Sequence, residues 1–91
     1  MLNIEFSNQS KKFLKKLPPK HKRQVSGKIQ NLLDDPFPID SKILLGFPGF
    51  YRTDIGEYRI IYLVLASLLK IYLVGKRNDD EIYRKFKRLM Q

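Results

Sequence analysis

Charged side chains alternate with apolar residues in the stretch GFYRTDIGEYRIIYLV, residues 49–64. The charged members are Arg52, Asp54, Glu57 and Arg59. Charged groups inside a strand are costly to bury unless they are paired or serve a site. Arginine suits anion binding, because its planar fork can hold two oxygens of one phosphate at once. These residue types therefore favour an anion-binding site built on a sheet.

The register in which the two strands of this stretch pair decides whether Arg52 and Arg59 lie opposite each other. A two-residue turn at Ile55–Gly56 places Arg52 directly opposite Arg59, and like charges opposite each other destabilise a sheet. A three-residue turn shifts the pairing and sends the two arginines to opposite faces. The sequence leaves both registers open. Lys76 and Arg77 follow the last strand-like run and can bring further positive charge to the same edge.

Apolar spacing predicts the elements that carry these charges. Residues 2–6 alternate apolar and polar as a short strand does. Ser7 is suited to cap a helix over residues 8–17. Pro19 suits the first turn of a second helix, which ends near residue 33.

A loop at residues 34–40 separates these helices from three strand-like runs. The runs cover residues 50–55, 58–65 and 69–75. The segment between the loop and the first run predicts no more than a short extended piece that ends at Gly46. A final helix begins around Asp79, Asp80 and Glu81, because negative charge is favourable at a helix start.

The predicted order is β-α-α-β-β-β-α in a single domain over residues 1–91. Runs of strands after runs of helices indicate an α+β fold. We therefore expect a mainly antiparallel four-stranded sheet with a helical hairpin packed on one face. Gly27 inside the second helix costs about 1 kcal/mol relative to alanine, which predicts close packing between the two helices of the hairpin.

The charge balance points to an anionic partner. The chain has 18 Lys and Arg against nine Asp and Glu, a net charge of +9. Such an excess favours nucleic acid, a ribosome or an acidic protein. With no cysteine, a disulfide framework and a thiol nucleophile are excluded, and a zinc site is not expected. His21, in a basic helix far from the charged stretch, is interpreted as a surface residue.

The sequence also predicts a location. The first ten residues lack the basic-then-apolar layout of a signal peptide. The longest apolar run, residues 60–69, is about half of the roughly 20 residues that span a bilayer. We therefore expect a cytoplasmic protein without a membrane partner.

Three segments resemble the RelE/ParE superfamily of bacterial and archaeal toxins: FYRTDIGEYRIIYLV, LKIYLVGKR and EIY. The resemblance covers essentially the whole chain, because the strand, hairpin, loop and three strands follow the family order. It implies a compact sheet whose concave side is open to RNA. The RelE branch cuts messenger RNA in the ribosomal A site, whereas the ParE branch poisons DNA gyrase.

The resemblance implies roles for single residues. Arg59 matches the arginine of the central strand, Arg77 the arginine after GK, and Tyr83 the tyrosine of the last helix. Arg52 stands where RelE-type enzymes carry a basic residue. The implied reaction needs no metal or cofactor: the RNA 2′-hydroxyl attacks the adjacent phosphate and leaves a 2′,3′-cyclic phosphate. Arg59 and Arg77 would stabilise the charged intermediate, and Tyr83 would transfer a proton or stack on a base.

Asp54 departs from the family pattern, because RelE enzymes carry a second basic residue at this position. An aspartate among arginines is expected to be ionised and paired, and it would repel a phosphate; the alternative is that it acts as the base. The candidate catalytic residues are Arg52, Asp54, Arg59, Arg77 and Tyr83. The residues expected to bind RNA are Lys42, Lys76 and Arg84.

The resemblance thus implies the toxin of a type II toxin–antitoxin pair, acting as a ribosome-dependent mRNA endonuclease. The alternatives are a ParE-like gyrase poison and a catalytically impaired toxin relative. The implied partners are a cognate antitoxin, mRNA and the ribosome. We expect the lysine-rich helices to aid docking on 16S or 23S ribosomal RNA through salt-sensitive attraction to phosphates.

Overall fold

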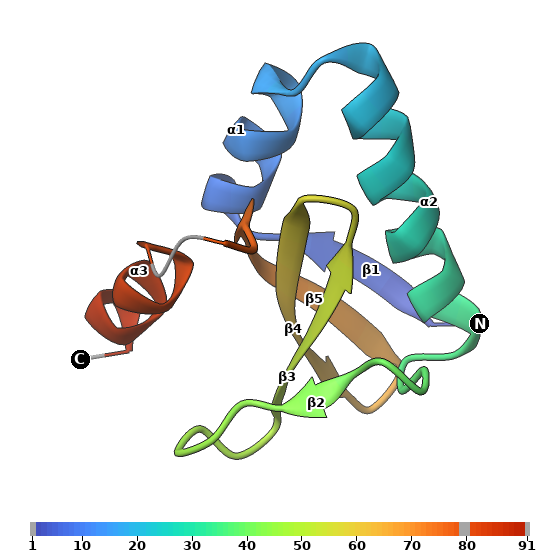
Figure 1. Ribbon diagram of the computed structural model, residues 1–91. Helices are drawn as coiled ribbons and strands as arrows, with labels where there is room; N and C mark the ends of the chain where they lie inside the picture. Colours follow the sequence, from blue (N-terminus) through green and yellow to red (C-terminus); the bar gives the residue numbers. More distant parts are fainter. Residues whose placement is uncertain (1, 79–80, 91) are drawn as a thin grey trace.

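The computed structural model describes residues 2–78 and 81–90. Within them, five strands form one sheet in the spatial order β1-β5-β4-β3-β2. The strands are β1 (Asn3–Phe6), β2 (Lys42–Ile43), β3 (Phe50–Ile55), β4 (Tyr58–Leu65) and β5 (Leu68–Lys76). The helices, shown in Figure 1, are α1 (Asn8–Lys16), α2 (Pro19–Asp34) and α3 (Glu81–Leu89). Asp79 and Asp80, expected at the start of the last helix, lie outside the described residues.

The sheet confirms the expected α+β class and element order. β1 runs parallel to β5, and the other neighbouring strands are antiparallel. The sheet has one strand more than expected, because the segment before β3 adds β2 at the edge. β2 pairs through Lys42 with Arg52 and through Ile43 with Tyr51.

The turn between β3 and β4 differs from both registers expected from the sequence. Its two residues are Gly56 and Glu57, which places Asp54 opposite Arg59. Gly56 has φ +57°, a value that glycine adopts without steric cost. Arg52 lies two residues from Asp54 on the same face, so the two arginines are diagonal neighbours. Arg59 therefore faces a carboxylate, which relieves the repulsion that a directly opposed arginine would cause.

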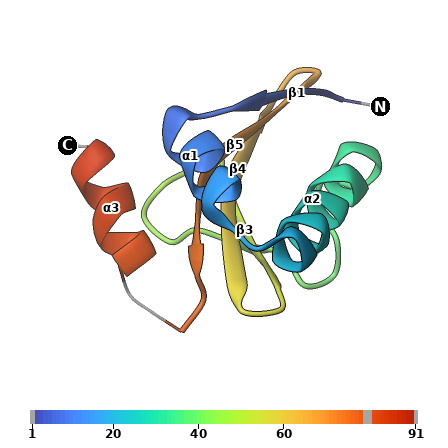
Figure 2. The ribbon, with the colours of Figure 1, turned by 90° about the horizontal axis from the view of Figure 1, so that it is seen from above.

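The helical hairpin covers one face of the sheet, as expected, and Figure 2 shows its two helices from above. Ser7 caps α1 by accepting a hydrogen bond from the backbone N–H of Ser10 at 3.1 Å. The apolar stripe of α2 is buried against β4 and β5 through Val25, Ile29 and Leu32. This core fixes the sheet from one side.

Two hairpin residues do not lie where the sequence predicted. Gly27 is exposed, and a Cβ placed there would meet nothing within 4 Å, so the close packing expected at this glycine is wrong. His21 is half-buried, and its Nδ1 lies 2.6 Å from the hydroxyl of the buried Tyr58. Tyr58 and Arg59 are neighbours on β4 and so point to opposite faces. The histidine therefore joins α2 to the sheet on the face away from Arg59.

α3 packs on the other face of the sheet. Its residues Ile82 and Phe86 are buried in a second core with Ile61 and Leu73. Successive β4 residues alternate between this core and the hairpin core, as the two-residue period of a strand requires. The charged positions of β3 and β4 share the face that α3 covers, so this helix determines what stands next to them.

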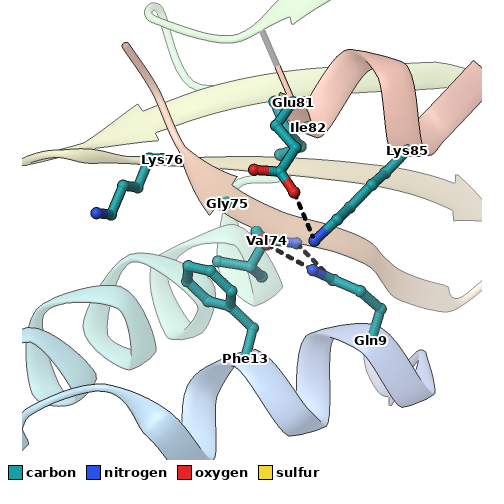
Figure 3. A pocket seen from close by; sticks show the side chains of 8 residues that line it. All are labelled: Gln9, Phe13, Val74, Gly75, Lys76, Glu81, Ile82 and Lys85. Carbon is teal, nitrogen blue, oxygen red and sulfur yellow. Dashed lines mark hydrogen bonds and ion pairs between the residues drawn. The ribbon is translucent and has the colours of Figure 1, made fainter. Parts of the chain in front are cut away.

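Side chains of α1 complete one edge of β5. β1 ends at Phe6 and leaves the later residues of β5 without a strand partner on that side. Gln9 pairs with Val74 in both directions: its amide donates to the backbone carbonyl at 2.9 Å, and its carbonyl oxygen accepts from the N–H at 3.1 Å (Figure 3). The Ser7 hydroxyl donates to the carbonyl of Tyr72 in the same row. Side chains thus take the place of a strand.

Candidate functional site

Asp54, Arg59 and Tyr83 form one hydrogen-bonded cluster on the α3 face of the sheet. The guanidinium group of Arg59 holds Asp54 in a bidentate ion pair, with Nε–Oδ1 at 2.6 Å and Nη2–Oδ2 at 3.0 Å. Nη1 of Arg59 donates to the Tyr83 hydroxyl. The Arg59 Cζ lies 5.5 Å from the centroid of the Tyr83 ring. Two strands supply the ion pair, and α3 supplies the tyrosine.

The charge of Arg59 is compensated inside this cluster. Hydrogen bonds from Arg59 hold the pKa of Asp54 below its usual value against the opposing effect of burial, and the charges of Arg59, Arg52 and Arg77 act in the same direction. The hydrogen bond to Asp54 in turn raises the pKa of Arg59. Asp54 is therefore ionised at neutral pH. It is a weak proton acceptor, because an efficient general base has a pKa near the working pH.

The lowered pKa of Asp54 makes a prediction about acid stability. The ion pair contributes its full stabilisation above the ordinary pKa of 3.8, and loses it as the pH falls through the lower pKa of the folded state. Asp54→Asn should therefore lose less stability than the wild-type protein when the pH is lowered below about 4. Thermal unfolding at a series of pH values measures this. Between pH 6 and 8 the difference between the two proteins should stay constant, and parallel curves down to pH 2 would contradict the prediction.

A groove of 760 Å³ lies between the β2 segment and α3, next to the cluster. Basic and apolar side chains line it: Lys42, Ile43, Leu44, Leu45, Phe47, Arg52, Tyr83, Arg84, Phe86 and Lys87. The charged members of this lining are all cationic. The Tyr83 hydroxyl accepts a hydrogen bond from Arg59, so its own O–H proton is available to another acceptor. The groove therefore suits an anionic ligand that also has an apolar or aromatic part.

The expected site residues do not all meet at this cluster. Arg52 is half-buried on β3 and pairs in register with Lys42 of β2, so both line the groove. Arg77 is exposed just beyond β5, where its backbone N–H donates to the carbonyl of Glu57 at 2.8 Å. Lys76 lines a smaller pocket at the β5 edge, shown in Figure 3, whose lining includes none of the three cluster residues.

The apolar floor of the groove was not predicted from the sequence. Phe47 and Phe86 pack edge to face with ring centroids 4.7 Å apart. Leu44 is buried in the same core, and Lys87 adds a cation to the lining. The i, i+4 spacing of Ile82 and Phe86 indicates a buried stripe on the last helix. No sequence pattern, however, indicates that this stripe meets Phe47.

The charged side chains that line this groove and could bind a ligand are all cationic. Residues 2–78 and 81–90 contain no group of three or more His, Cys, Asp or Glu side chains that could hold a metal ion. No helix in the same part of the chain is long and apolar enough to cross a membrane.

The segment that contains the strands of the cluster matches a known protein family. Residues 4–81 match the family described as the ParE toxin of the type II toxin–antitoxin system parDE. The chain belongs to this toxin family. The match ends at the first residue of α3, so it includes Asp54 and Arg59 of the toxin but not Tyr83. The expected RelE/ParE membership is confirmed.

The toxin is also similar to RelE proteins. RelE1 of Methanocaldococcus jannaschii is 36% identical over 66 residues, which are 69% of this chain and 73% of the relative. The RelE–RelB complex of Pyrococcus horikoshii OT3 matches with 29% identity and a TM-score of 0.73, over 84% of this chain and 94% of the other. The intact E. coli RelBE toxin–antitoxin complex matches with 25% identity and a TM-score of 0.74, over 84% and 96%. The toxin thus has a RelE-type fold.

Gly75 of the toxin lies opposite Arg59 and beneath α3. A Cβ at this position would lie 3.1 Å from the Cβ of Ile82. Gly75→Val should therefore lower the free energy of unfolding by about 1–3 kcal/mol, because the added methyl groups must displace the helix. Urea denaturation measures this change.

The matched control for Gly75→Val is Gly27→Ala. This second glycine is helical and exposed, and an added Cβ there meets nothing within 4 Å. The free energy of unfolding of the control should rise by about 0.5–1 kcal/mol, because alanine is more favourable than glycine inside a helix. A Gly75→Val protein as stable as the wild type would contradict the close approach of α3 to the sheet.

Proposed function

We propose that this toxin is an RNA-cleaving enzyme that acts on messenger RNA bound to the ribosome, and that a cognate antitoxin holds it inactive. One observation carries the proposal: the Asp54–Arg59–Tyr83 cluster lies beside a groove whose charged lining is entirely cationic. A phosphodiester is an anion flanked by aromatic bases, which is the kind of ligand that such a groove accepts. Membership of the toxin family agrees with this function.

In the proposed reaction, the RNA 2′-oxygen forms a bond to the neighbouring phosphorus, and the bond from phosphorus to the 5′-oxygen breaks. The products are a 2′,3′-cyclic phosphate and a free 5′-hydroxyl. Arg52, Arg59 and Arg77 stabilise the negative charge that grows on the phosphate oxygens. Tyr83 donates its O–H proton to the leaving 5′-oxygen. The cluster offers no carboxylate with a raised pKa to take the 2′-proton. This proton therefore passes to hydroxide or water, so we expect the cleavage rate to rise with pH.

An antitoxin is the proposed protein partner. The RelE chains of E. coli and P. horikoshii were solved in complexes with RelB. The net charge of +9 supports a partner with complementary charge, because such partners associate quickly and in a salt-dependent way. A partner that covers the groove would block access of RNA to Arg59.

Primer extension on a defined message in a purified translation system tests the enzymatic proposal. We expect new 5′ ends only when the toxin and ribosomes are both present. Addition of a purified antitoxin should suppress these ends. Intact message under saturating toxin, with translating ribosomes present, would refute the mRNA endonuclease function.

A ParE-like gyrase poison is the second candidate function. Two observations favour it: the matching family is described as the ParE toxin, and Asp54 neutralises the arginine that would hold the phosphate. Purified gyrase with supercoiled plasmid provides the test. Accumulation of cleaved DNA complexes with gyrase, together with intact message in the ribosome assay, would favour this function over RNA cleavage.

A further inference from the structure

We propose that Asp54 is a built-in anion that occupies the phosphate-binding fork of Arg59, and that an RNA phosphate must displace it to bind there. This inference rests on the proposed RNA-binding function and deepens it. It makes Asp54 a positioning residue that sets the affinity of the site for its substrate.

The geometry of the ion pair supports this role. A carboxylate and a phosphate present similar pairs of oxygens to a guanidinium group. Asp54 uses Nε and Nη2 of Arg59, which are donors that a phosphate would need for bidentate binding. Nη1 donates to Tyr83. Three of the five N–H donors of Arg59 are thus engaged within the protein.

Asp54 is held at this place by the sheet and not by a flexible loop. It stands directly opposite Arg59 in the β3–β4 pairing, and both side chains are largely shielded from solvent, with exposed fractions of 29% and 15%. Solvent therefore weakens the attraction between them less than at an exposed pair. An incoming phosphate meets a neutralised guanidinium and the repulsion of the carboxylate.

The charges of neighbouring arginines can stabilise the Asp54 carboxylate after it leaves Arg59. Arg52 lies two residues along β3 on the same face, and the charges of both Arg52 and Arg77 already act on Asp54. Within residues 2–78 and 81–90, neither of these arginines has an ion-pair partner of its own. A phosphate attracted by the charges of Arg52 and Arg77 can therefore exchange with Asp54 at Arg59. The expected cost of this exchange is weaker RNA binding than a site without the aspartate would show.

Binding of a short single-stranded RNA with 2′-O-methyl groups throughout tests the proposal, because this RNA lacks the hydroxyl needed for cleavage. Asp54→Asn is expected to bind about tenfold more tightly than the wild-type protein at 0.1 M salt, because it releases one arginine. Its affinity should also fall more steeply with salt, by about 0.7 in the logarithmic slope, because in the wild type the displaced Asp54 carboxylate takes up a cation and offsets the release of one counterion. Fluorescence anisotropy at several salt concentrations gives both quantities.

The matched control is Asp40→Asn. Asp40 is also ion-paired, with its Oδ2 3.0 Å from Lys28 Nζ, and it accepts a hydrogen bond from Thr53. The control removes the same charge outside the cluster, so it should change the RNA affinity less than twofold. A gain for Asp54→Asn no larger than that of Asp40→Asn would overturn the proposal. The double variant Asp54→Asn/Arg59→Gln should bind no more tightly than Arg59→Gln alone.

A measurement on the wild-type protein covers the case in which Asp54→Asn does not fold. The Nε–H resonance of Arg59 reports its hydrogen bond to Asp54. Saturation with the 2′-O-methyl RNA should shift this resonance, because a phosphate oxygen replaces the carboxylate. An unchanged resonance at saturation would overturn the proposal, as would a failure of both proteins to bind RNA. Because neither readout needs cleavage, a toxin that binds this RNA but leaves messages intact would refute only the enzymatic function.

Discussion

Replacement of Arg59 by alanine should lower the rate of the proposed ribosome-dependent mRNA cleavage by about 100-fold or more, as loss of one donor to a transition-state anion commonly does. The effect has two parts. The variant removes the cation that would stabilise the phosphate, and it leaves Asp54 as an uncompensated negative charge beside the substrate. It also frees Tyr83 from its anchoring hydrogen bond. Primer extension under single-turnover conditions measures the loss.

Two variants separate this effect from a general loss of charge. Arg23→Ala removes the same charge from an exposed position on α2. At saturating toxin, where weaker docking through the basic helices does not limit the rate, it should change the rate less than threefold. Arg59→Lys keeps the charge but cannot hold two oxygens in one plane, so its rate should lie between those of the wild type and Arg59→Ala. If Arg59→Ala cleaved at the same rate as Arg23→Ala, the proposed role of Arg59 in cleavage would be wrong.

Phe86→Ala should cause the largest loss of stability of any substitution considered, about 3–5 kcal/mol. The side chain is 1% exposed and packs against three aromatic rings. Ring centroids of Phe47, Phe50 and Tyr72 lie 4.7, 5.0 and 5.7 Å from its own. Truncation leaves a cavity between α3 and the sheet, so Tyr83 should also lose its place beside Arg59. Guanidinium denaturation gives the change in unfolding free energy.

Leu89→Ala is the control on the same helix. Its side chain is 56% exposed, so its removal should change the free energy of unfolding by no more than about 0.5 kcal/mol. Similar losses for the two variants would mean that α3 is not anchored through Phe86. Cleavage activity should follow the same order, with Phe86→Ala impaired at temperatures where the sheet is still folded.

Local rules predicted most elements of the fold. Ser7 is an N-cap residue and Pro19 begins the second helix, as each residue type favours. The two-residue strand β2 lies within the segment in which the sequence predicted at most a short extended piece. It could not be predicted as a strand, because two residues are too few to show the alternation of a strand. The β3–β4 register was missed for a related reason. Gly56 fits either position of a two-residue turn, and both choices keep the same side chains on the same face.

The candidate site was predictable only in part. Arg59 and Tyr83, to which the family resemblance gave roles, are hydrogen-bonded to each other, and the expectation that Asp54 is paired is confirmed. The choice of Arg59 as its partner depends on the register, which the sequence left open. The groove could not be predicted, because it arises where the segment around Phe47 meets a helix almost 40 residues later. Such long-range packing leaves no local pattern.

Gln9 also affects how the protein behaves among copies of itself. An uncovered strand edge offers unpaired N–H and carbonyl groups that recruit strands from other molecules and so start aggregation. At Val74 that edge is closed by a single glutamine side chain on a helix, which satisfies both groups at once. Removal of this side chain would leave both groups of Val74 unpaired at an open strand edge, so Gln9 protects the sheet against edge-to-edge pairing from a helix outside it.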